Sequence, residues 1–505
     1  MNGENILSLA QALWKAVITT FLGHPSIHKW LTTHPRFIQF FQARFTKKSF
    51  YGLSLTILVI AFLYTVALLA GIIQDYLVGD PLIEADKRLA NLLFAFRTPS
   101  LVHAFYFITL FAEASVIVVM SLLLTALFWW KRLHIFIVTL WLTLITSEGA
   151  AYLGKLLFHR LRPDQLLRAI EEDSFSFPSG HATTVMAFYG VLAYVLIRTH
   201  RSWLVRTSCF FGAVAMVIIV DFSRLYLGVH YLSDVLAGDL LGLAALIFAI
   251  SVTEWLLWKN EKQELSFTLP LLAAFSVVEV CVVSGLFFFA HSPWTKAQQP
   301  QLEHIKTDMV LSLFQKGTLP LYTETLVGNH QEPINLIVIA KPDCLPKDFA
   351  AAHWGLADVL SYHSLKQAAK AVLFNQADAT APMTPSFYDA RPHDMGFEKQ
   401  TEKQTVRARH HARFWKTRYE TESGALFVGT ISLDTDTKWG GITHTIAPDI
   451  DTERNVFVSD LKKAGVIQRQ SDTQFIAPTL GKNFSGDAFF TDGKAVFLAL
   501  DSCKS

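Results

Sequence analysis

Charged residues and cysteines are scarce in this sequence, and neither sign of charge is in clear excess. Charged residues make up 17% of the 505 positions, whereas an average soluble domain carries about 25%, which argues against an ordinary soluble enzyme. The net charge of +2 argues against a nucleic-acid-binding protein that works through bulk positive charge. The four cysteines form no C-x-x-C pair, so neither a zinc ribbon nor a disulfide scaffold is indicated.

Apolar residues are abundant, at 51% of the chain with 40 Phe and 12 Trp, which excludes a disordered protein. Long apolar runs are confined to the first part of the chain, and each is close to the roughly 20 residues that a helix needs to cross a bilayer. We predict about seven spans, at residues 51–73, 103–128, 133–158, 180–198, 204–221, 231–257 and 268–291. The predicted fold is therefore mainly α, a polytopic helical membrane bundle followed by a soluble α/β or α+β domain.

The distribution of Lys and Arg predicts how the bundle is oriented. Arg36, Arg44, Lys47 and Lys48 precede the first span, and further basic residues follow spans two, four and six. The positive-inside rule places these segments in the cytoplasm. Seven spans then place residues 293–505 outside, which in a bacterial inner membrane means the periplasm.

Residues 6–22 are apolar but contain Gln11 and Lys15, and no basic segment precedes them. A signal peptide is therefore disfavoured, and an interfacial amphipathic helix is predicted instead. If this stretch spans the membrane, the predicted orientation is inverted.

Three groups of polar residues stand at the outer ends of predicted spans, and the topology brings them to one membrane face. They are Lys155, Arg162 and Pro163 after span three, Pro178, Ser179, Gly180 and His181 before span four, and Ser223, Arg224, His230 and Asp234 between spans five and six. Ionisable groups beside hydrocarbon cost a few kcal/mol each, so a cluster of them indicates a function.

These residue types suit phosphate chemistry. Two guanidinium groups can bind phosphate oxygens, and a helix that begins at Ser179-Gly180 offers free N–H groups to an anion. Asp234 can orient His230 through Nδ1 and leave Nε2 as a nucleophile, while His181 can donate a proton to a leaving oxygen. Taken singly, Arg162 could be a snorkelling anchor, a histidine a structural polar group, and Pro-Ser-Gly an ordinary cap.

The three groups match a known signature. They resemble the type 2 phosphatidic acid phosphatase family, whose motifs are K-x6-RP, PSGH and SR-x5-H-x3-D, and all eleven specified letters occur here with the family spacing. The resemblance covers roughly residues 50–257. It implies a six-helix phosphatase core, and it divides the chain into an N-terminal segment (1–49), a phosphatase domain (50–260), an additional span (261–292) and a C-terminal domain (293–505) that is similar to LssY-type domains.

The resemblance also implies a metal-independent and cofactor-free mechanism. His230 would attack phosphorus to give a phosphohistidine, oriented by Asp234, and His181 would protonate the leaving group. The phosphoryl oxygens would be held by Lys155, Arg162, Ser179, Gly180 and Arg224. The substrate would be a lipid phosphate or pyrophosphate, and phosphatidate, phosphatidylglycerophosphate, polyprenyl pyrophosphate and a lipid A phosphate remain open. Glu171, Glu172 and Asp173 are expected to shape headgroup choice.

Three other functions compete with the phosphatase. A phosphotransferase would pass phosphate from His230 to a lipid acceptor, and the sequence does not separate it from a hydrolase. A vanadium haloperoxidase shares the motif but is soluble. A non-catalytic anchor for the C-terminal domain would be expected to carry degenerate motif letters, and none is degenerate. Within the spans, Glu113, Asp239 and Glu279 are predicted to form structural hydrogen bonds between helices.

In the C-terminal domain, residues 334–340, 426–433 and 495–500 are predicted as strands and 364–374 as an amphipathic helix. Residues 406–415 alternate, with Arg407, Arg409, His411 and Arg413 on one face. We predict a solvated edge strand protected by charge. The alternative is a surface for an anionic ligand or lipid headgroup, which would lose affinity for anionic liposomes when Arg409 and Arg413 are neutralised.

His410, His411, His444, Asp449 and Asp451 could suggest a metal site, but His410 and His411 point to opposite faces of a strand and cannot both ligate one ion. No metal site is therefore predicted. Cys344 and Cys503 would both be periplasmic and could form a disulfide.

Overall fold

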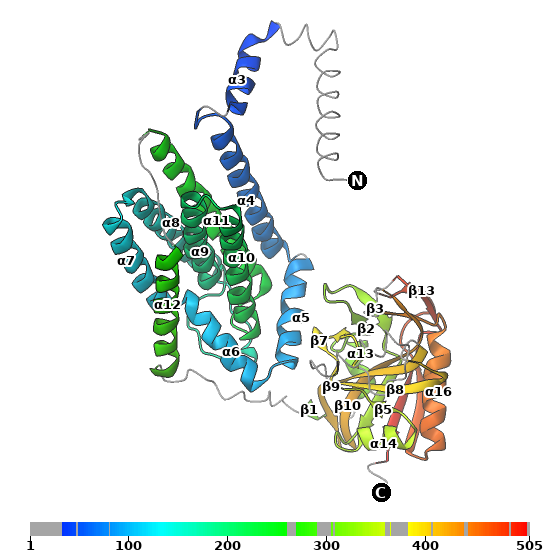
Figure 1. The fold of residues 1–505 in the computed structure, drawn as a ribbon. Helices are drawn as coiled ribbons and strands as arrows, with labels where there is room; N and C mark the ends of the chain where they lie inside the picture. Colours follow the sequence, from blue (N-terminus) through cyan, green and yellow to red (C-terminus); the bar gives the residue numbers. More distant parts are fainter. Residues whose placement is uncertain are drawn as a thin grey trace.

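The computed structural model describes residues 33–46, 49–79, 81–259, 269–289, 305–306, 309–358, 364, 382–405, 408–438, 443–483 and 486–501. A bundle of long helices forms the first part of the chain, and a sheet-rich domain forms the second (Figure 1). Two predictions, the helix at 6–22 and the helix at 364–374, fall on residues that lie outside this description, apart from residue 364.

Among the described residues, five helices are long and apolar enough to cross a membrane. They are α4 (Leu53–Val78), α8 (His134–Phe158), α9 (Gly180–Thr199), α10 (Trp203–Tyr226) and α11 (Leu232–Lys259). A sixth candidate span is a pair bent by 43° at Glu113, which consists of α6 (Pro99–Thr109) with the short helix η1 (Leu110–Ala112), followed by α7 (Ala114–Trp130). At the seventh predicted span lies α12 (Leu269–Phe289), whose fully described part, Phe275–Phe288, is shorter than a span. Among the described residues, five to six spans are thus supported, where about seven were predicted over the whole chain.

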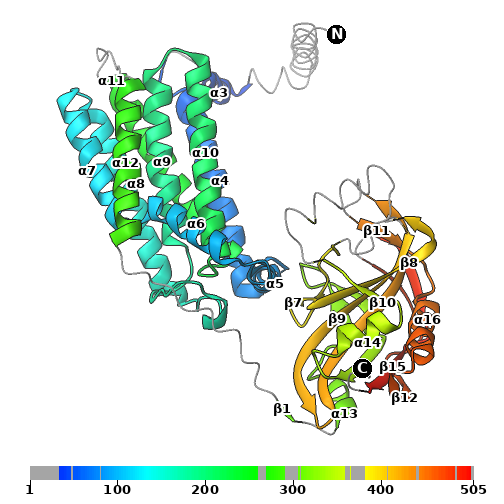
Figure 2. The same cartoon turned by 60° about the horizontal axis from the view of Figure 1, so that its bottom comes forward.

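Helix α5 (Pro81–Ala95) lies between the first and second predicted spans, where no helix was predicted. It lies at the end of the bundle that faces the sheet-rich domain (Figures 1 and 2). A shorter helix, α3 (Pro35–Phe45), precedes α4, and a single turn, η2 (Gln165–Leu167), follows α8.

The buried apolar core of the bundle is contributed mainly by α7, α8 and α9, with further residues from α6, η1, α10, α11 and α12. Small residues bring α11 close to the start of α9. A Cβ at Gly238 would lie 2.5 Å from the Ser179 carbonyl oxygen, and one at Gly242 would lie 2.7 Å from that of Thr183. Only glycine permits this separation, as is common where membrane helices pack tightly. Glu279 of α12 accepts a hydrogen bond from the Tyr189 hydroxyl at 2.6 Å, which confirms its predicted role between helices.

The sheet-rich domain is built on one large mixed sheet with the strand order β12-β15-β4-β10-β9-β8-β5. These strands are β12 (Ile467–Gln474), β15 (Lys494–Leu500), β4 (Leu336–Ala340), β10 (Gly424–Lys438), β9 (Ala408–Thr421), β8 (Met395–Thr405) and β5 (Gly355–Leu356). Short strands β1 (Ile305–Lys306) and β11 (Thr443–Ile446) pair with β9 and β10. The three predicted strands correspond to β4, β10 and β15, and β10 extends beyond its prediction at both ends.

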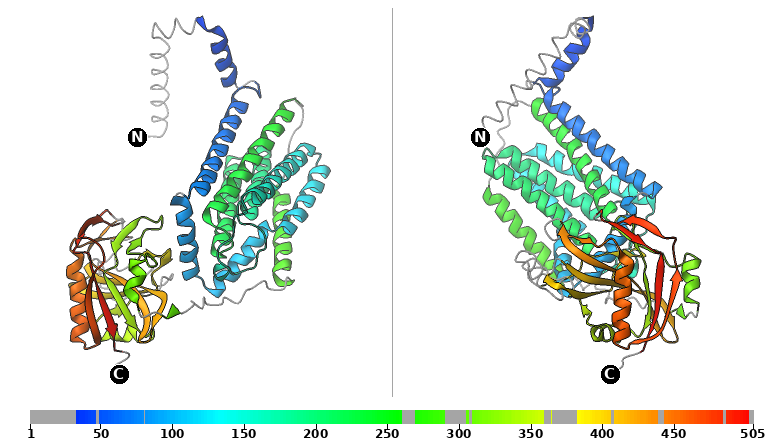
Figure 3. Two further views of the ribbon diagram at one scale, coloured as in Figure 1. Left: turned by 180° about the vertical axis from the view of Figure 1, so that it is seen from behind. Right: turned by 90° about the vertical axis from the view of Figure 1, so that its right-hand side faces the viewer.

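Two smaller sheets complete the domain. One has the order β3-β2-β6-β7, and its strands are β3 (His330–Pro333), β2 (Tyr322–Glu324), β6 (Phe387–Tyr388) and β7 (Arg391–Pro392). The other pairs β13 (Thr479–Lys482) with β14 (Ala488–Thr491). The helices α13 (Val310–Gln315), α14 (Leu345–Ala351) and α16 (Ile450–Lys463) pack against the sheets. Helix α16 lies on the side turned away from the bundle (Figures 1 and 3).

The prediction of a solvated edge strand at 406–415 is wrong. Strand β9 is internal, between β10 and β8, and its charged face is buried. Arg409 pairs with Glu398 at 2.6 Å and with Asp434 at 3.5 Å, and His411 pairs with Asp434 at 2.9 Å. Since acidic neighbours neutralise these cations inside the domain, they form no surface for an anionic ligand or lipid headgroup. Arg407 lies outside the described residues.

Three further residues that were considered for a metal site have structural partners. Asp449 caps α16 by accepting from the N–H groups of Asp451 and Thr452, and Asp451 pairs with Arg454. His410 pairs with Glu453 at 2.6 Å. Within the described part of the chain, no group of three His, Cys, Asp or Glu side chains is arranged to hold a metal ion. Cys344 is disulfide-bonded, whereas Cys209 and Cys281 are free; the predicted partner, Cys503, lies outside the described residues.

Candidate active site

The predicted site residues meet at one end of the bundle, beside α5. The last turn of α8 carries Lys155, the N-terminus of α9 carries Ser179, Gly180 and His181, and the last turn of α10 carries Arg224. His230 lies in the short connection just before α11, and Asp234 lies in the first turn of α11. The helix ends thus bring together residues up to 79 positions apart.

Arg162 is held by the backbone around it. Its Nε donates to the Ser174 carbonyl oxygen at 2.7 Å, and its Nη1 donates to that of Val229 at 2.8 Å. The same Nη1 lies 3.2 Å from His230 Nε2. Lys155 reaches the same region, because its Nζ donates to the Ser174 hydroxyl at 2.9 Å. One guanidinium therefore lies directly against the predicted nucleophilic nitrogen.

Glu172 joins the two predicted phosphate-binding arginines. One of its oxygens pairs with Arg162 Nη2 at 3.3 Å, and the other accepts a hydrogen bond from Arg224 Nη2. Arg224 is nearly fully buried and also donates to the Thr109 hydroxyl. A carboxylate thus occupies the position between two guanidinium groups where a phosphate could bind in the same manner.

His230 and Asp234 face each other across a serine. His230 Nδ1 lies 3.6 Å from Asp234 Oδ2, and Ser176 Oγ donates to that oxygen at 2.5 Å while lying 3.4 Å from Nδ1. The Tyr231 N–H donates to the same oxygen at 2.8 Å. The predicted pairing of the two side chains is thus present, but His230 precedes α11, so the two residues do not share a helical face.

Sequence reasoning missed a buried ionic chain behind Asp234. Arg160 Nη1 donates to Asp234 Oδ1 at 2.6 Å, and its Nη2 donates to Asp86 Oδ2 at 2.7 Å. Asp86 also accepts from the Ser233 N–H at 3.0 Å and from its hydroxyl at 2.5 Å. Both carboxylates are fully buried. The only sequence signal was the position of Arg160 two residues before Arg162, and nothing pointed to Asp86.

His181 pairs with an acidic residue at the bend between η1 and α7. Its Nε2 lies 3.4 Å from Glu113 Oε2. Glu113 was predicted to make only structural contacts, but it lines a cavity of about 320 Å³ together with Thr109, Glu172 and Arg224. Tyr106 and Leu286 line the same cavity, so it presents both charged and apolar surface beside Arg224.

The N-terminus of α9 is fixed on one side and open on the other. The Ser179 N–H donates to the Asp234 carbonyl oxygen at 2.9 Å, and the Ser179 hydroxyl caps the helix. A Cβ added at Gly180 would meet no protein atom within 4 Å. Open space therefore lies next to Gly180, at a helix end whose N–H groups favour an anion.

Burial and charge set the protonation states of this site. Burial raises the pKa of Glu172, but Arg224 and Arg162 outweigh that effect and hold it well below its usual range. Burial lowers the pKa of Arg162 to about 10. The pKa of His230 is lowered well below its ordinary value, first by burial and then by the charges of Arg162, Arg224 and Lys155.

The lowered pKa of His230 predicts a pH profile. A neutral imidazole in the free protein should persist below the ordinary histidine pKa of about 6.5. For the phosphate release that the family resemblance implies, kcat/KM would report the free enzyme, so it should show no loss attributable to a histidine between about pH 7.5 and 6. A titration of kcat/KM across this range measures it, and a fall of about fourfold, which a group with a pKa near 6.5 would give, would contradict the expectation.

Comparison with known proteins matches both halves of the chain. Residues 133–258 match the PAP2 superfamily, and residues 316–495 match the family described as the LssY C-terminus. The chain carries a PAP2 superfamily domain and an LssY-type C-terminal domain.

Relatives of the PAP2 domain are lipid phosphatases by name. The chain is 44% identical over 86 residues to phosphatidylglycerophosphatase B of Bacillus subtilis, covering 17% of this chain and 41% of that protein. It is 37% identical over 79 residues to lipid A 1-phosphatase of Rhizobium johnstonii, covering 15% and 28%. A solved PAP2-type phosphatidylglycerolphosphate phosphatase from Bacillus subtilis is 28% identical, with 39% of this chain and 96% of that chain covered and a TM-score of 0.33. The sequence matches thus span less than half of these two curated relatives.

Proposed function

We propose that the chain is an integral membrane phosphohydrolase that removes phosphate from a lipid phosphate or pyrophosphate. The observation that carries the proposal is the arrangement of Arg162, Arg224 and Glu172 beside His230 Nε2. The two guanidinium groups hold one anion, and an imidazole nitrogen lies 3.2 Å from one of them. A phosphoryl group that replaced the Glu172 carboxylate would bring its phosphorus close to a nucleophile.

The proposed first step is attack of His230 Nε2 on phosphorus. Nε2 must carry a lone pair, so the ring proton must stay on Nδ1, where Ser176 and Asp234 Oδ2 are the acceptors within reach. Charge that builds on the phosphoryl oxygens would be stabilised by Lys155, Arg162, Arg224 and the N–H groups at Ser179 and Gly180. The bond to the leaving oxygen breaks as the N–P bond forms.

The proposed acid is His181. Protonated, it would give its proton to the leaving alkoxide or phosphate, and neutral again it would take a proton from the water that attacks the phosphohistidine. The position of the ring supports this assignment, because His181 lies in the first turn of α9 beside Gly180 and its Nε2 lies 3.4 Å from Glu113 Oε2. Hydrolysis then releases inorganic phosphate and restores His230. No metal ion enters this scheme.

The substrate is proposed to be a lipid, because the site lies where apolar spans end. The relatives point first to phosphatidylglycerophosphate, with a lipid A phosphate as the second candidate. We place the site on the periplasmic side of a bacterial inner membrane, on the basis of the Lys and Arg distribution. The C-terminal domain is placed on the same side, because it contacts α5, which lies beside the site. The domain limits 50–260, 261–292 and 293–505 belong to the same proposal.

Phosphate release by the full-length protein in detergent tests the function. Phosphatidylglycerophosphate, phosphatidate, a polyprenyl pyrophosphate and a lipid A phosphate would be supplied in turn, with EDTA present. Turnover is expected on one class at a rate of about 1–1,000 per second, in the ordinary range for enzymes. No release from folded protein without an added lipid acceptor, but transfer of phosphate to that acceptor, would replace the hydrolase by the phosphotransferase.

A further inference from the structure

Helix α5 touches the candidate site on one side and the C-terminal domain on the other. Its side chain Asp86 is fully buried against the phosphatase helices, and its side chain Arg88, two residues later, is 5% exposed and turned to the C-terminal domain. A single helix, α5, therefore lies between the candidate site and the C-terminal domain (Figure 1).

On the inner side, α5 fixes the residues that hold Asp234. Asp86 binds Arg160 and both the N–H and the hydroxyl of Ser233, and Arg160 binds Asp234. The single buried cation is shared by two buried carboxylates, so a displacement of Asp86 changes how Arg160 binds Asp234. The segment after α5 adds a second link, because Arg97 donates to the Tyr226 carbonyl oxygen at 2.8 Å, two residues after Arg224.

On the outer side, a few polar contacts hold the C-terminal domain to α5. Arg88 donates to Glu324 Oε2 through Nε at 3.0 Å and through Nη2 at 2.7 Å, and Asn91 donates to the Ala390 carbonyl oxygen at 2.9 Å. The loop after β2 covers the guanidinium closely, since a Cβ at Gly328 would lie 3.1 Å from Arg88 Nη1. The other carboxylate partner of Arg88, Glu84, is half-exposed.

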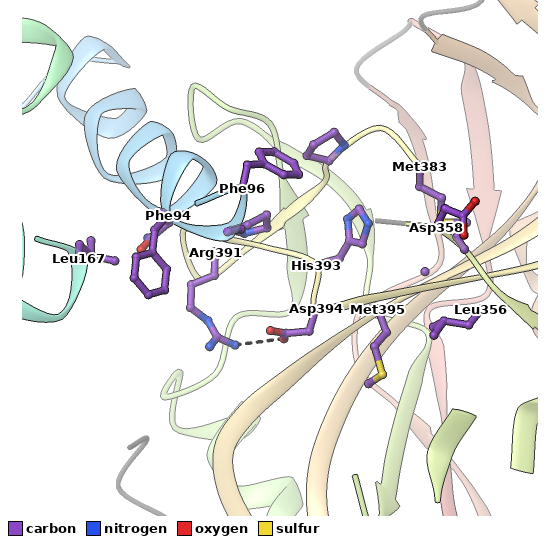
Figure 4. A pocket seen from close by; sticks show the side chains of 16 residues that line it. Phe94, Phe96, Leu167, Leu356, Asp358, Met383, Arg391, His393, Asp394 and Met395 are labelled. Atoms are coloured by element: carbon purple, nitrogen blue, oxygen red, sulfur yellow. Dashed lines mark ion pairs between the residues drawn. The ribbon is translucent and has the colours of Figure 1, made fainter. Parts of the chain in front are cut away.

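The rest of the contact between α5 and the C-terminal domain is loosely packed. A cavity of about 520 Å³ lies between the end of α5 and the C-terminal domain, lined by Phe94, Phe96, Leu167, Met383 and His393 among others (Figure 4). The Arg391–Asp394 ion pair visible there stays within the C-terminal domain. A cavity of this size forfeits dispersion contacts, so the polar contacts of Arg88 and Asn91 carry much of the docking.

We propose that the C-terminal domain positions the catalytic carboxylate of the PAP2 domain through α5. The Arg88–Glu324 pair holds α5 in place, α5 holds Asp86 against Arg160 and Ser233, and these in turn hold Asp234 against His230. Glu324 and Asp86 are positioning residues in this chain, and neither touches the substrate. The expected effect on the rate rests on the proposed function. The chain of contacts from Glu324 to Asp234 does not depend on that function.

The substitution Glu324→Gln in the full-length protein tests the inference. It leaves Arg88 buried without its closest counter-ion, so α5 should shift toward solvent. We expect kcat for phosphate release to fall about 5- to 20-fold with little change in KM, within the usual range of coupling between sites. Hydrogen exchange at residues 231–235 should accelerate by a similar factor, because the Ser233 N–H is bonded to Asp86.

Two further variants sharpen the test. Glu422→Gln, at the exposed turn between β9 and β10, is the matched control and should change neither quantity. The double variant Arg88→Gln/Glu324→Gln should lose no more kcat than either single variant, because the two residues act as one pair. Multiplied losses would overturn the inference.

The exchange measurement separates the two proposals. Unchanged exchange at 231–235 in folded Glu324→Gln protein would overturn the inference, whatever the activity. Faster exchange in a protein whose wild type releases no phosphate from any lipid would support the inference and remove the proposed function.

Discussion

Replacing His230 with alanine is expected to lower phosphate release by a factor of about 10⁴ to 10⁶, the loss typical of removing a nucleophile that acts as a unit with its partners. The imidazole is 2% exposed and lies between Arg162 and the Ser176–Asp234 pair. A water molecule in its place would be a much weaker nucleophile than an imidazole nitrogen. The anion-binding arginines would remain, so substrate should still bind.

Initial rates of phosphate release from the accepted lipid measure this effect. His200→Ala is the matched control, because His200 lies at the other end of α9, where its Nδ1 contacts the Leu196 carbonyl oxygen. The control should keep the wild-type rate. A His230→Ala protein that retained a tenth or more of the activity would show that this imidazole is not the nucleophile.

Replacing Arg160 with glutamine should damage stability and activity together. Two fully buried carboxylates, Asp86 and Asp234, would lose the cation they share. Breaking a buried ion pair by removing one partner costs about 3–5 kcal/mol, because an uncompensated charge stays behind. Burial already holds the pKa of Asp86 above its usual value, and Arg160 counteracts that effect. Without Arg160, Asp86 should take up a proton and Asp234 should lose its fixed orientation.

Thermal unfolding in detergent and the rate of phosphate release measure both effects. Arg198→Gln serves as the control, because it removes an ion pair between Arg198 and Glu254. The Arg198 side chain is 44% exposed. Exposed pairs contribute about 0–1 kcal/mol, so this control should unfold and turn over like the wild type. Equal stability of the Arg160 and Arg198 variants would contradict the buried-network interpretation.

The sequence was sufficient to find the residues at three helix ends, because each motif is short and contiguous. Spacing within a motif reports local geometry, and apolar spans of known length bring their ends to one face. Arg162, Arg224, His230 and Asp234 were found in this way. Arg160 and Asp86 were not, since their partners lie 73 or more positions away and depend on how helices pack. Helix α5 itself was not predicted, because its charged residues are not typical of a membrane span.

Strand β9 shows a second limit of sequence reasoning. Alternating Arg and His residues are typical of a solvated strand, and the alternation itself was correct. The matching acids, Glu398 and Asp434, lie on the two neighbouring strands, β8 and β10. Charge pairing across strands is a property of the register, which a single strand does not reveal. The Arg88–Glu324 contact, 236 residues apart, was hidden because it depends on how the two domains pack.

The glycines of α11 have a consequence for how the protein responds to its bilayer. Gly238 and Gly242 let the α11 backbone lie directly against Ser179 and Thr183, so the anion-binding turn of α9 and Asp234 of α11 are joined without intervening side chains. A change in hydrocarbon thickness is accommodated mainly by helix tilt. The two helices should then tilt as one body, which keeps the spacing between the turn and the carboxylate constant in thin and thick membranes alike.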